Sequence, residues 1–293
     1  MIVCIGDMVV DILVQHKEKN YGTDAEGNIQ FRAGGQSNNV AAWVAHSGVE
    51  SRLIGIVGQD VFGEFLIKEA EDIGVKCLVD IHDTVETGRI LILIEENGER
   101  SMITTRGANL HLSDEHIYKH ENSIQNADVL YLSGYSLFVK NPLNAIYVAK
   151  ELAMKHGVKI AVDPSSVYYL KSYKDKFFQF LDGINFLFPN YEEGIELTGE
   201  ESPEKILKRL REFVENPILK LGEKGCLMYY GGAYISISSP HVKAIDTTGA
   251  GDTFVGTFLA HYHLSKDIVV AANEAVQAAA RMVQFIGARP IKE

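Results

Sequence analysis

The chain has 293 residues, of which 46% are hydrophobic and 23% charged, as in a globular protein that needs no disulfide or metal to fold. Its 39 acidic residues outnumber its 28 basic ones and give a net charge of −11, which argues against nucleic acid or an anionic membrane surface as a partner. Its three cysteines are far apart and lack CxxC spacing, so we expect reduced thiols and neither a metal site nor a disulfide frame.

The chain also lacks the signals of membrane insertion or export. No apolar run reaches the roughly 18 residues that a membrane span needs. The apolar start at 1–5 stops at Gly6 and Asp7, unlike a signal peptide. We therefore expect a cytoplasmic protein with no membrane contact.

Short apolar runs alternate with amphipathic segments along most of the chain. The runs predict strands at 2–5, 51–57, 129–132, 159–162, 186–188 and 217–220. Apolar residues at helical spacing predict helices at 38–47, 61–73, 143–156 and 203–214. Strands that alternate with helices over this length indicate an α/β protein whose parallel sheet is covered by helices on both faces.

Two segments without helical periodicity interrupt this alternation. Residues 13–32 are polar, with turn signals at 21–23 and 26–28. Residues 87–105 predict a hairpin in which the strands 89–94 and 101–104 flank a turn at 96–99. Together the two segments could form a small β-sheet, either as surface excursions or as a lid that shields a reactive phosphate from water. The pattern alone favours neither reading.

A loop of small residues, 246–252 (DTTGAGD), leads into a segment with helical spacing. Such a junction presents backbone N–H groups at the positive end of a helix dipole, and Gly249, Ala250 and Gly251 would let a phosphate approach them closely. Asp252 would repel that phosphate, so its carboxylate makes sense as a base that takes a proton from an attacking hydroxyl. Phosphoryl transfer needs little beyond positioning, charge neutralisation and such a group.

A purely structural reading of this loop is also open. Thr248 could cap the helix while Asp252 complements its dipole, which is common at glycine-rich turns. The motifs of other nucleotide-binding enzymes do not occur in the sequence: there is no GxxxxGK[ST], no GxGxxG after a strand, and no HRD or DFG set. The loop by itself leaves both readings open.

The segment 246–256 (DTTGAGDTFVG) resembles the C-terminal signature of the ribokinase-like, or PfkB, carbohydrate kinases. The segment 33–41 (AGGQSNNVA) resembles their N-terminal signature, and further matches in the family's order lie at 6–11, 55–63, 107–110, 189–193 and 220–225. The resemblance spans nearly the whole chain. It implies a doubly wound, mostly parallel α/β fold with a small β-sheet lid that often serves for dimerisation. We therefore expect a homodimer through the lid, an α/β core at 1–12, 33–86 and 106–293, and a lid at 13–32 and 87–105.

The resemblance also assigns roles to the loop residues. It implies that Asp252 is the catalytic base and that the 249–251 amides form an anion hole for the transferring phosphate. Asp246 and Thr248 match positions that bind a monovalent cation in some members, so K⁺ is an open expectation.

Further matching residues would hold ATP and Mg²⁺. Asn190 and Glu193 match an NxxE pattern that organises Mg²⁺ through waters and phosphates, although Glu193 could instead be a solvated helix residue. The nucleotide would run past Lys220, Gly222 and Gly225. Lys220 could equally be a strand-end lysine, and Gly225 fits a turn better.

On the acceptor side, Asp11 resembles the acid that accepts hydrogen bonds from sugar hydroxyls. Gly34, Gly35 and Asn39 resemble the set that binds the phosphoacceptor. The two glycines could also form a hinge between lid and core.

Several positions depart from ribokinase itself. Val9 stands where ribokinase usually has Asn, the segment 34–39 reads GGQSNN in place of GGKGAN, and Ser133 stands in place of Glu. Each change removes a polar contact to ribose, and a bound hydroxyl that loses its partner costs roughly 1–3 kcal/mol. The sugar specificity could therefore differ from that of ribokinase.

The segment 163–166 (DPSS) departs from another pattern, the DxNxR of 2-keto-3-deoxygluconate kinases. It lacks the Arg that would meet the carboxylate of an acid sugar, a task that Arg32 or Arg106 could take. Asp163 either contacts the substrate or merely ends a strand.

We therefore expect an ATP-dependent kinase that phosphorylates a hydroxymethyl group of a small sugar or sugar derivative. A nucleoside kinase of the same fold is an alternative, since Phe31, Ile90, Ile92 and Ile103 of the lid could supply an apolar slot for a base. A non-catalytic sugar-binding regulator is a remote alternative, because it would predict loss of Asp252 or of the small-residue loop.

Overall fold

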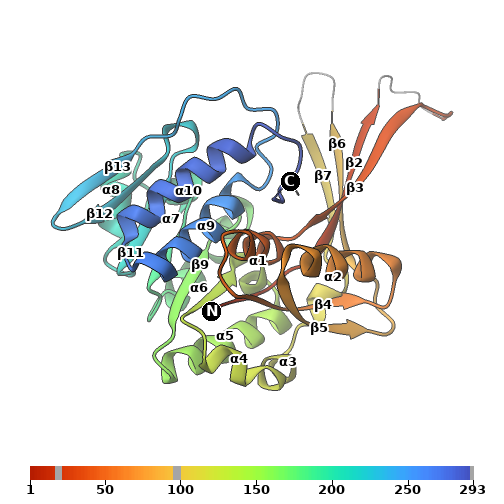
Figure 1. Cartoon of the computed structure of the whole chain (residues 1–293), viewed down its shortest axis with the longest axis horizontal. Coiled ribbons are helices and arrows are strands. Elements are labelled where there is room, and N and C mark those ends of the chain that lie inside the picture. The colour runs from red at the N-terminus through yellow and green to blue at the C-terminus, as the bar shows by residue number, and fades with distance from the viewer. Residues whose placement is uncertain (17–21, 95–99, 291–293) are drawn as a thin grey trace.

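The computed structural model describes residues 1–16, 22–94 and 100–290, and two sheets organise them (Figure 1). The larger sheet has nine strands in the spatial order β13 (Ala233–Ile237), β12 (Cys226–Tyr230), β11 (Asn216–Lys220), β10 (Phe186–Leu187), β9 (Lys159–Asp163), β8 (Val129–Ser133), β1 (Ile2–Ile5), β4 (Ser51–Gly58) and β5 (Val75–His82). The strands from β11 to β5 pair in parallel, whereas β12 and β13 extend one edge antiparallel.

Ten helices cover this sheet in the described part of the chain: α1 (Gln36–His46), α2 (Val61–Ile73), α3 (Asp114–Lys119), α4 (Glu121–Gln125), α5 (Lys140–Lys155), α6 (Val167–Phe180), α7 (Tyr191–Thr198), α8 (Pro203–Leu210), α9 (Ala250–Ser265) and α10 (Ile268–Met282). Short 3₁₀ turns lie at Gly107–His111, Gly134–Phe138 and Gly222–Lys224.

The two faces of the sheet bury two separate hydrophobic clusters. Helices α1, α2, α9 and α10 pack on one face, and α3 to α8 pack on the other. In β1, Val3 and Ile5 face one cluster while Ile2 and Cys4 face the other, so every side chain of the strand is buried. This is why central strands read as continuous apolar runs, and it confirms the predicted doubly wound α/β fold.

The structure contains the predicted strands and helices, but several of them begin or end at other residues than predicted. The strand 2–5 and the helix 61–73 have the predicted bounds, whereas α1 begins earlier, at Gln36, and α8 ends earlier, at Leu210. The edge strands β5 and β13, the strand β12 next to the β13 edge and the helix α10 were not predicted. Edge strands are half-exposed, and their mixed polar and apolar residues resemble those of loops.

The smaller sheet confirms the expected lid, with the order β3 (Gly27–Gly34), β2 (Val9–His16), β6 (Gly88–Ile94) and β7 (Arg100–Thr105). The predicted hairpin pairs antiparallel as β6 and β7, and its turn at 96–99 lies outside the described residues. The predicted turn at 26–28 is wrong, because β3 begins at Gly27 and pairs with β2. Figure 1 shows this sheet standing beside the main body.

The lid strands run past the expected borders, since β2 begins at Val9 and β3 reaches Gly34. The proposed division into a core and a lid at 12/13 and 32/33 stays a prediction. Among the described residues, no helix combines the length and the apolar character that a membrane crossing needs.

Candidate active site

The carboxyl ends of the parallel strands gather polar side chains at one edge of the main sheet. Asp163 ends β9, Ser133 ends β8, Lys220 ends β11, and Asp7 follows β1. Ser133 and Asp163 lie side by side in register. Ligands of open α/β sheets bind at this edge, so it is where a site is expected.

The loop 246–252 enters α9 at this edge. Gly249 is the N-cap of α9, with a left-handed φ of 77° and no side-chain cap, so Thr248 does not cap the helix. The N–H of Ala250 donates to the Thr247 carbonyl at 3.2 Å. No acceptor among the described residues meets the N–H groups of Gly249 and Gly251. These two amides are therefore available to an anion, while Ala250 is already engaged.

Asp252 lies in the first turn of α9 and faces α1. Its Oδ2 accepts a hydrogen bond from Nδ2 of Asn39 at 2.8 Å. Burial raises the pKa of Asp252 to about 8; Asn39 and Lys220 oppose this shift, and Asp163 adds to it. A carboxyl group with this pKa takes up a proton readily near neutral pH, which suits a general base.

Lys220 links the strand ends to the loop. Its Nζ forms an ion pair with Asp163, and a Cβ on Gly251 would lie only 3.3 Å from that Nζ. Burial acts to lower the pKa of Lys220, but Asp163 and Glu193 outweigh it and raise the pKa. A charged ammonium group therefore lies beside the amide of Gly251, and its contact with a phosphate stays a prediction.

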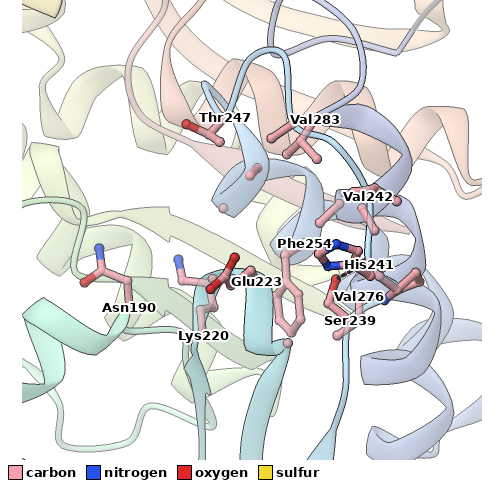
Figure 2. Close-up of a pocket in the computed structure, with 18 residues that line it drawn as sticks. Asn190, Lys220, Glu223, Ser239, His241, Val242, Thr247, Phe254, Val276 and Val283 are labelled. Carbon is pink, nitrogen blue, oxygen red and sulfur yellow. Dashed lines mark hydrogen bonds between the residues drawn. The ribbon is translucent and has the colours of Figure 1, made fainter. Parts of the chain in front are cut away.

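A cavity of about 360 Å³ opens from this loop towards α10. Figure 2 shows Lys220 and Glu223 to one side of Phe254, with His241 and Val276 to the other. The cavity lining is polar at Asn190 and Lys220, and beyond Phe254 it combines the apolar Val242 and Val276 with the polar Ser239 and His241. The remaining lining residues include Gly222, Gly225, Ala244, Ala250, Gly251, Ala279 and Val283. The side at Lys220 thus suits phosphates, and the other side offers apolar surface and polar groups that suit a flat ring with polar edges.

Gly225 meets a steric requirement besides lining the cavity. Its φ is 89°, and a Cβ there would lie 1.9 Å from the carbonyl oxygen of Ile237. Gly222 also has a positive φ, of 59°, but has open space around it. The turn reading of Gly225 therefore has direct structural support, and the contact with a nucleotide stays a prediction.

Asn190 and Glu193 cap the helix α7 together. Oδ1 of Asn190 accepts the N–H of Glu193, and Oε2 of Glu193 accepts the N–H of Asn190, both at 2.8 Å. Glu193 is buried, not solvated, and burial followed by the charge of Asp163 raises its pKa to about 7. Asn190 lines the cavity, and the two hydrogen bonds to Glu193 hold Asn190 in place.

Asp246 forms hydrogen bonds within its own loop and with the segment after α10. It is buried; Oδ1 accepts the N–H of Thr248 at 2.8 Å, and Oδ2 accepts the N–H of Gly287 at 3.0 Å. The side chain of Ala288 lies where a Cβ of Gly249 would need to be. The shape of the loop 246–252 therefore depends on the segment after α10.

The expected acceptor residues meet at the base of the lid. Asp11, on β2, is buried against Gly34 of β3, where a Cβ would lie 2.4 Å from Oδ2 of Asp11. A Cβ on Gly35 would lie 2.5 Å from the Asp7 carbonyl, and its φ is 95°. Burial, and then the charge of Asp7, raise the pKa of Asp11 to about 7. Asn39 connects this group to Asp252.

A hydrogen-bond network around Gln36 was not predicted. Oε1 of Gln36 accepts the hydroxyl groups of Ser133 and Ser165, both at 2.7 Å, and its N–H donates to Asp7 at 3.0 Å. Ser165 has a φ of 73°, and its N–H donates to Asp163. Three of the positions that depart from the patterns of ribokinase and of 2-keto-3-deoxygluconate kinases, namely Gln36, Ser133 and Ser165, thus contact one another. This grouping can be recognised only in three dimensions.

The two arginines named for an acid sugar have different surroundings. Arg32 is exposed and donates to Gln30 at 2.9 Å. The guanidinium group of Arg106 lies over the rings of Tyr135 and Tyr169, at 4.9 and 5.2 Å from their centroids. Arg32 is therefore placed as a surface residue, and Arg106 as part of an aromatic cluster.

Known proteins resemble this chain over most of its length. Ribokinase from Haemophilus influenzae is 28% identical over 239 residues, which are 79% of this chain and 74% of the relative. The structure of adenosine kinase from Sinorhizobium meliloti is similar with a TM-score of 0.91 at 25% identity, covering 99% of this chain and 96% of that one. A protein described as Ribokinase II from E. coli, in complex with ATP and Mg²⁺, has a TM-score of 0.89 at 25% identity and covers 98% and 94%.

The profile of the pfkB family carbohydrate kinases matches residues 1–293. This match, the fold and the relatives agree with the resemblance of the two signature segments, so the chain belongs to the pfkB family of carbohydrate kinases.

Proposed function

We propose that this kinase transfers the γ-phosphate of ATP to a hydroxymethyl group of a small sugar or sugar derivative. The observation that carries the proposal is the position of Asp252 between two sets of residues. Its carboxylate is hydrogen-bonded to Asn39 of the acceptor set, and its own helix turn lines the cavity suited to a nucleotide. A base between donor and acceptor is what in-line transfer requires.

In this mechanism Asp252 accepts the proton of the hydroxymethyl group as its oxygen attacks the γ-phosphorus. The new O–P bond forms while the bond from the γ-phosphorus to the β,γ-bridging oxygen breaks, and ADP leaves. The amides of Gly249 and Gly251 and the ammonium group of Lys220 stabilise the charge on the transferring phosphoryl group. The proton stays on Asp252 until the product leaves.

Magnesium would bind at the polar end of the cavity together with the nucleotide. No cluster of three or more His, Cys, Asp or Glu side chains that could hold a metal occurs in the described residues. Mg²⁺ keeps several waters and is held largely by phosphates, so the buried Glu193 and the cavity residue Asn190 fit an indirect role. When bound, the ion would neutralise phosphate charge. The possible use of K⁺ at Asp246 and Thr248 stays open.

A nucleoside acceptor is the second candidate. The similarity to the adenosine kinase structure favours it, as does Phe31 on β3, which is 52% exposed and lies 5.6 Å from the ring of Phe62. Ile103 is also exposed, whereas Ile92 is buried and cannot line an open slot.

A homodimer through the lid is part of the proposal, as is a cytoplasmic location. Among its described residues, the lid carries four exposed large apolar side chains: Ile29, Phe31, Met102 and Ile103. Such a patch is a candidate interface.

A coupled ADP-release assay over pentoses, hexoses, keto-deoxy acids and nucleosides tests the proposal. We expect ADP release that depends on one class of acceptor, with the phosphate recovered on that acceptor. ATP turnover that no acceptor stimulates would contradict the small-sugar and the nucleoside candidates together.

A further inference from the structure

Arg289 lies in the segment after α10, which hydrogen bonds hold beside the loop 246–252. The N–H of Gly287 donates to the Asp246 carboxylate, and the indole N–H of Trp43 donates to the Ala288 carbonyl at 2.9 Å. Figure 1 shows this end of the chain between the main body and the small sheet. The backbone that carries Arg289 is therefore held in place at the site.

The guanidinium group of Arg289 is buried without a hydrogen-bond partner. All three of its nitrogens are buried, although the residue as a whole is partly exposed, and no acceptor in the described residues meets any of them. Burial lowers the pKa of Arg289 to about 10, while Glu69, Cys77, Asp252 and Asp11 oppose this shift. The guanidinium group therefore lies within electrostatic reach of Glu69 on α2, of Cys77 on β5 and of the acids Asp11 and Asp252.

A buried guanidinium group without a hydrogen-bond partner destabilises the ligand-free protein. It stays charged at neutral pH, and a buried charge without a partner destabilises a fold unless a ligand supplies the acceptor. Neither Arg32 nor Arg106 is comparable, because the first is exposed and the second covers two tyrosine rings.

We propose that Arg289 binds an anionic oxygen group of the acceptor, a carboxylate or a phosphate, away from the hydroxyl that Asp252 deprotonates. This inference rests on the proposed kinase function and adds the acceptor class to it. The planar fork of the guanidinium group offers two parallel N–H donors that match both kinds of group. A neutral sugar could accept hydrogen bonds through its hydroxyl groups, but it would leave the charge of the guanidinium group unbalanced.

The acids nearby are compatible with an anionic acceptor. Burial raises the pKa of Asp11 to about 7, so a large share of this group is protonated near neutral pH. Arg289 acts against that shift. The acceptor side therefore holds less negative charge than its number of acidic residues suggests.

Matched acceptor pairs test the proposal by steady-state kinetics. Gluconate against glucose and 2-keto-3-deoxygluconate against ribose probe a carboxylate, and fructose 6-phosphate against fructose probes a phosphate. The parent should prefer the anionic member of at least one pair by roughly 10–100-fold in kcat/KM, as hydrogen bonds to a charged group predict. Arg289→Gln should bring that ratio close to one, and Arg289→Lys should leave an intermediate ratio. Arg281→Gln, on the exposed face of α10, should keep the parent's ratio.

Thermal unfolding without ATP gives a second readout. Gluconate, 2-keto-3-deoxygluconate or fructose 6-phosphate should raise the unfolding midpoint of the parent and of Arg281→Gln but not of Arg289→Gln. A parent that turns over only neutral acceptors, or an Arg289→Gln variant that keeps the anionic preference, would overturn the inference and leave the kinase proposal standing. If no acceptor of either kind were phosphorylated, the kinase proposal itself would fail.

Discussion

The nucleotide side and the acceptor side of this site differ in how well their polar side chains are satisfied. On the nucleotide side, Lys220 is paired with Asp163, and Asn190 is paired with Glu193. On the acceptor side, the buried atoms Oδ1 of Asp7, Oδ1 of Asn39 and the guanidinium nitrogens of Arg289 have no partner in the described residues.

This difference suggests which half of the site has its side chains paired before the ligand arrives. Buried polar groups are normally hydrogen-bonded, so unpaired ones beside a site are candidates for contact with a ligand. We infer that the nucleotide side offers a framework of paired side chains, whereas the acceptor side offers side chains that a ligand would satisfy. The variants below separate the two sides.

The largest effect should follow from Asp252→Asn. Loss of the base should reduce kcat by roughly 10²-fold or more, while ATP binding stays near the parent's value, because Asn keeps the shape of the side chain. Initial rates of ADP release and ATP titrations measure both. Asp114→Asn, an exposed carboxyl on α3, is the matched control. Turnover near that of the parent would remove Asp252 from the mechanism.

Lys220→Met should act mainly on the nucleotide side. The change removes the charge beside Gly251 and leaves Asp163 buried and unpaired, so we expect kcat/KM for ATP to fall by roughly 10–100-fold. Lys224→Met, which alters an exposed lysine of the following turn, should change little. Equal kinetics of the two variants would assign Lys220 a structural role only.

Asn39→Ala should act through the proton affinity of Asp252. In the parent, kcat/KM should rise as the pH rises through about 8, because the base must lose its proton before it can act. The hydrogen bond from Asn39 lowers the pKa of Asp252, so its removal should move this rise to higher pH. An unshifted profile, equal to that of the exposed control Asn273→Ala, would contradict the coupling.

A smaller effect concerns stability. The pKa of Asp252 rises from its ordinary value of 3.8 to about 8 on folding, so between these values the folded state binds more protons than the unfolded state. Stability should therefore fall as the pH rises through this window. Asp252→Asn removes that loss, so its unfolding midpoint should exceed the parent's at pH 8.5 by on the order of 5 °C. The gap should close near pH 4; a gap that does not depend on pH would argue against the raised pKa.

The sequence predicts the nucleotide side better than the acceptor side. The central strands are buried on both faces and read as apolar runs, and the loop 246–252 is contiguous, so both could be recognised without a structure. The network of Gln36, Ser133 and Ser165 could not, because its members are far apart in the chain and each appears only as a departure from a pattern. The sequence also gives no indication of a role for Arg289, because a single arginine outside any motif resembles a surface residue until its burial is known.

Transfer of labelled phosphate tests the central claim most directly. The protein is mixed with Mg²⁺, ATP labelled in the γ-phosphate and the best acceptor of the panel, and the label is followed in a single turnover. We predict that the label moves to a hydroxymethyl oxygen of the acceptor in the parent, and that Asp252→Asn slows this step without weakening ATP binding. Label that appears only as inorganic phosphate, or transfer at the same rate in Asp252→Asn, would contradict the account.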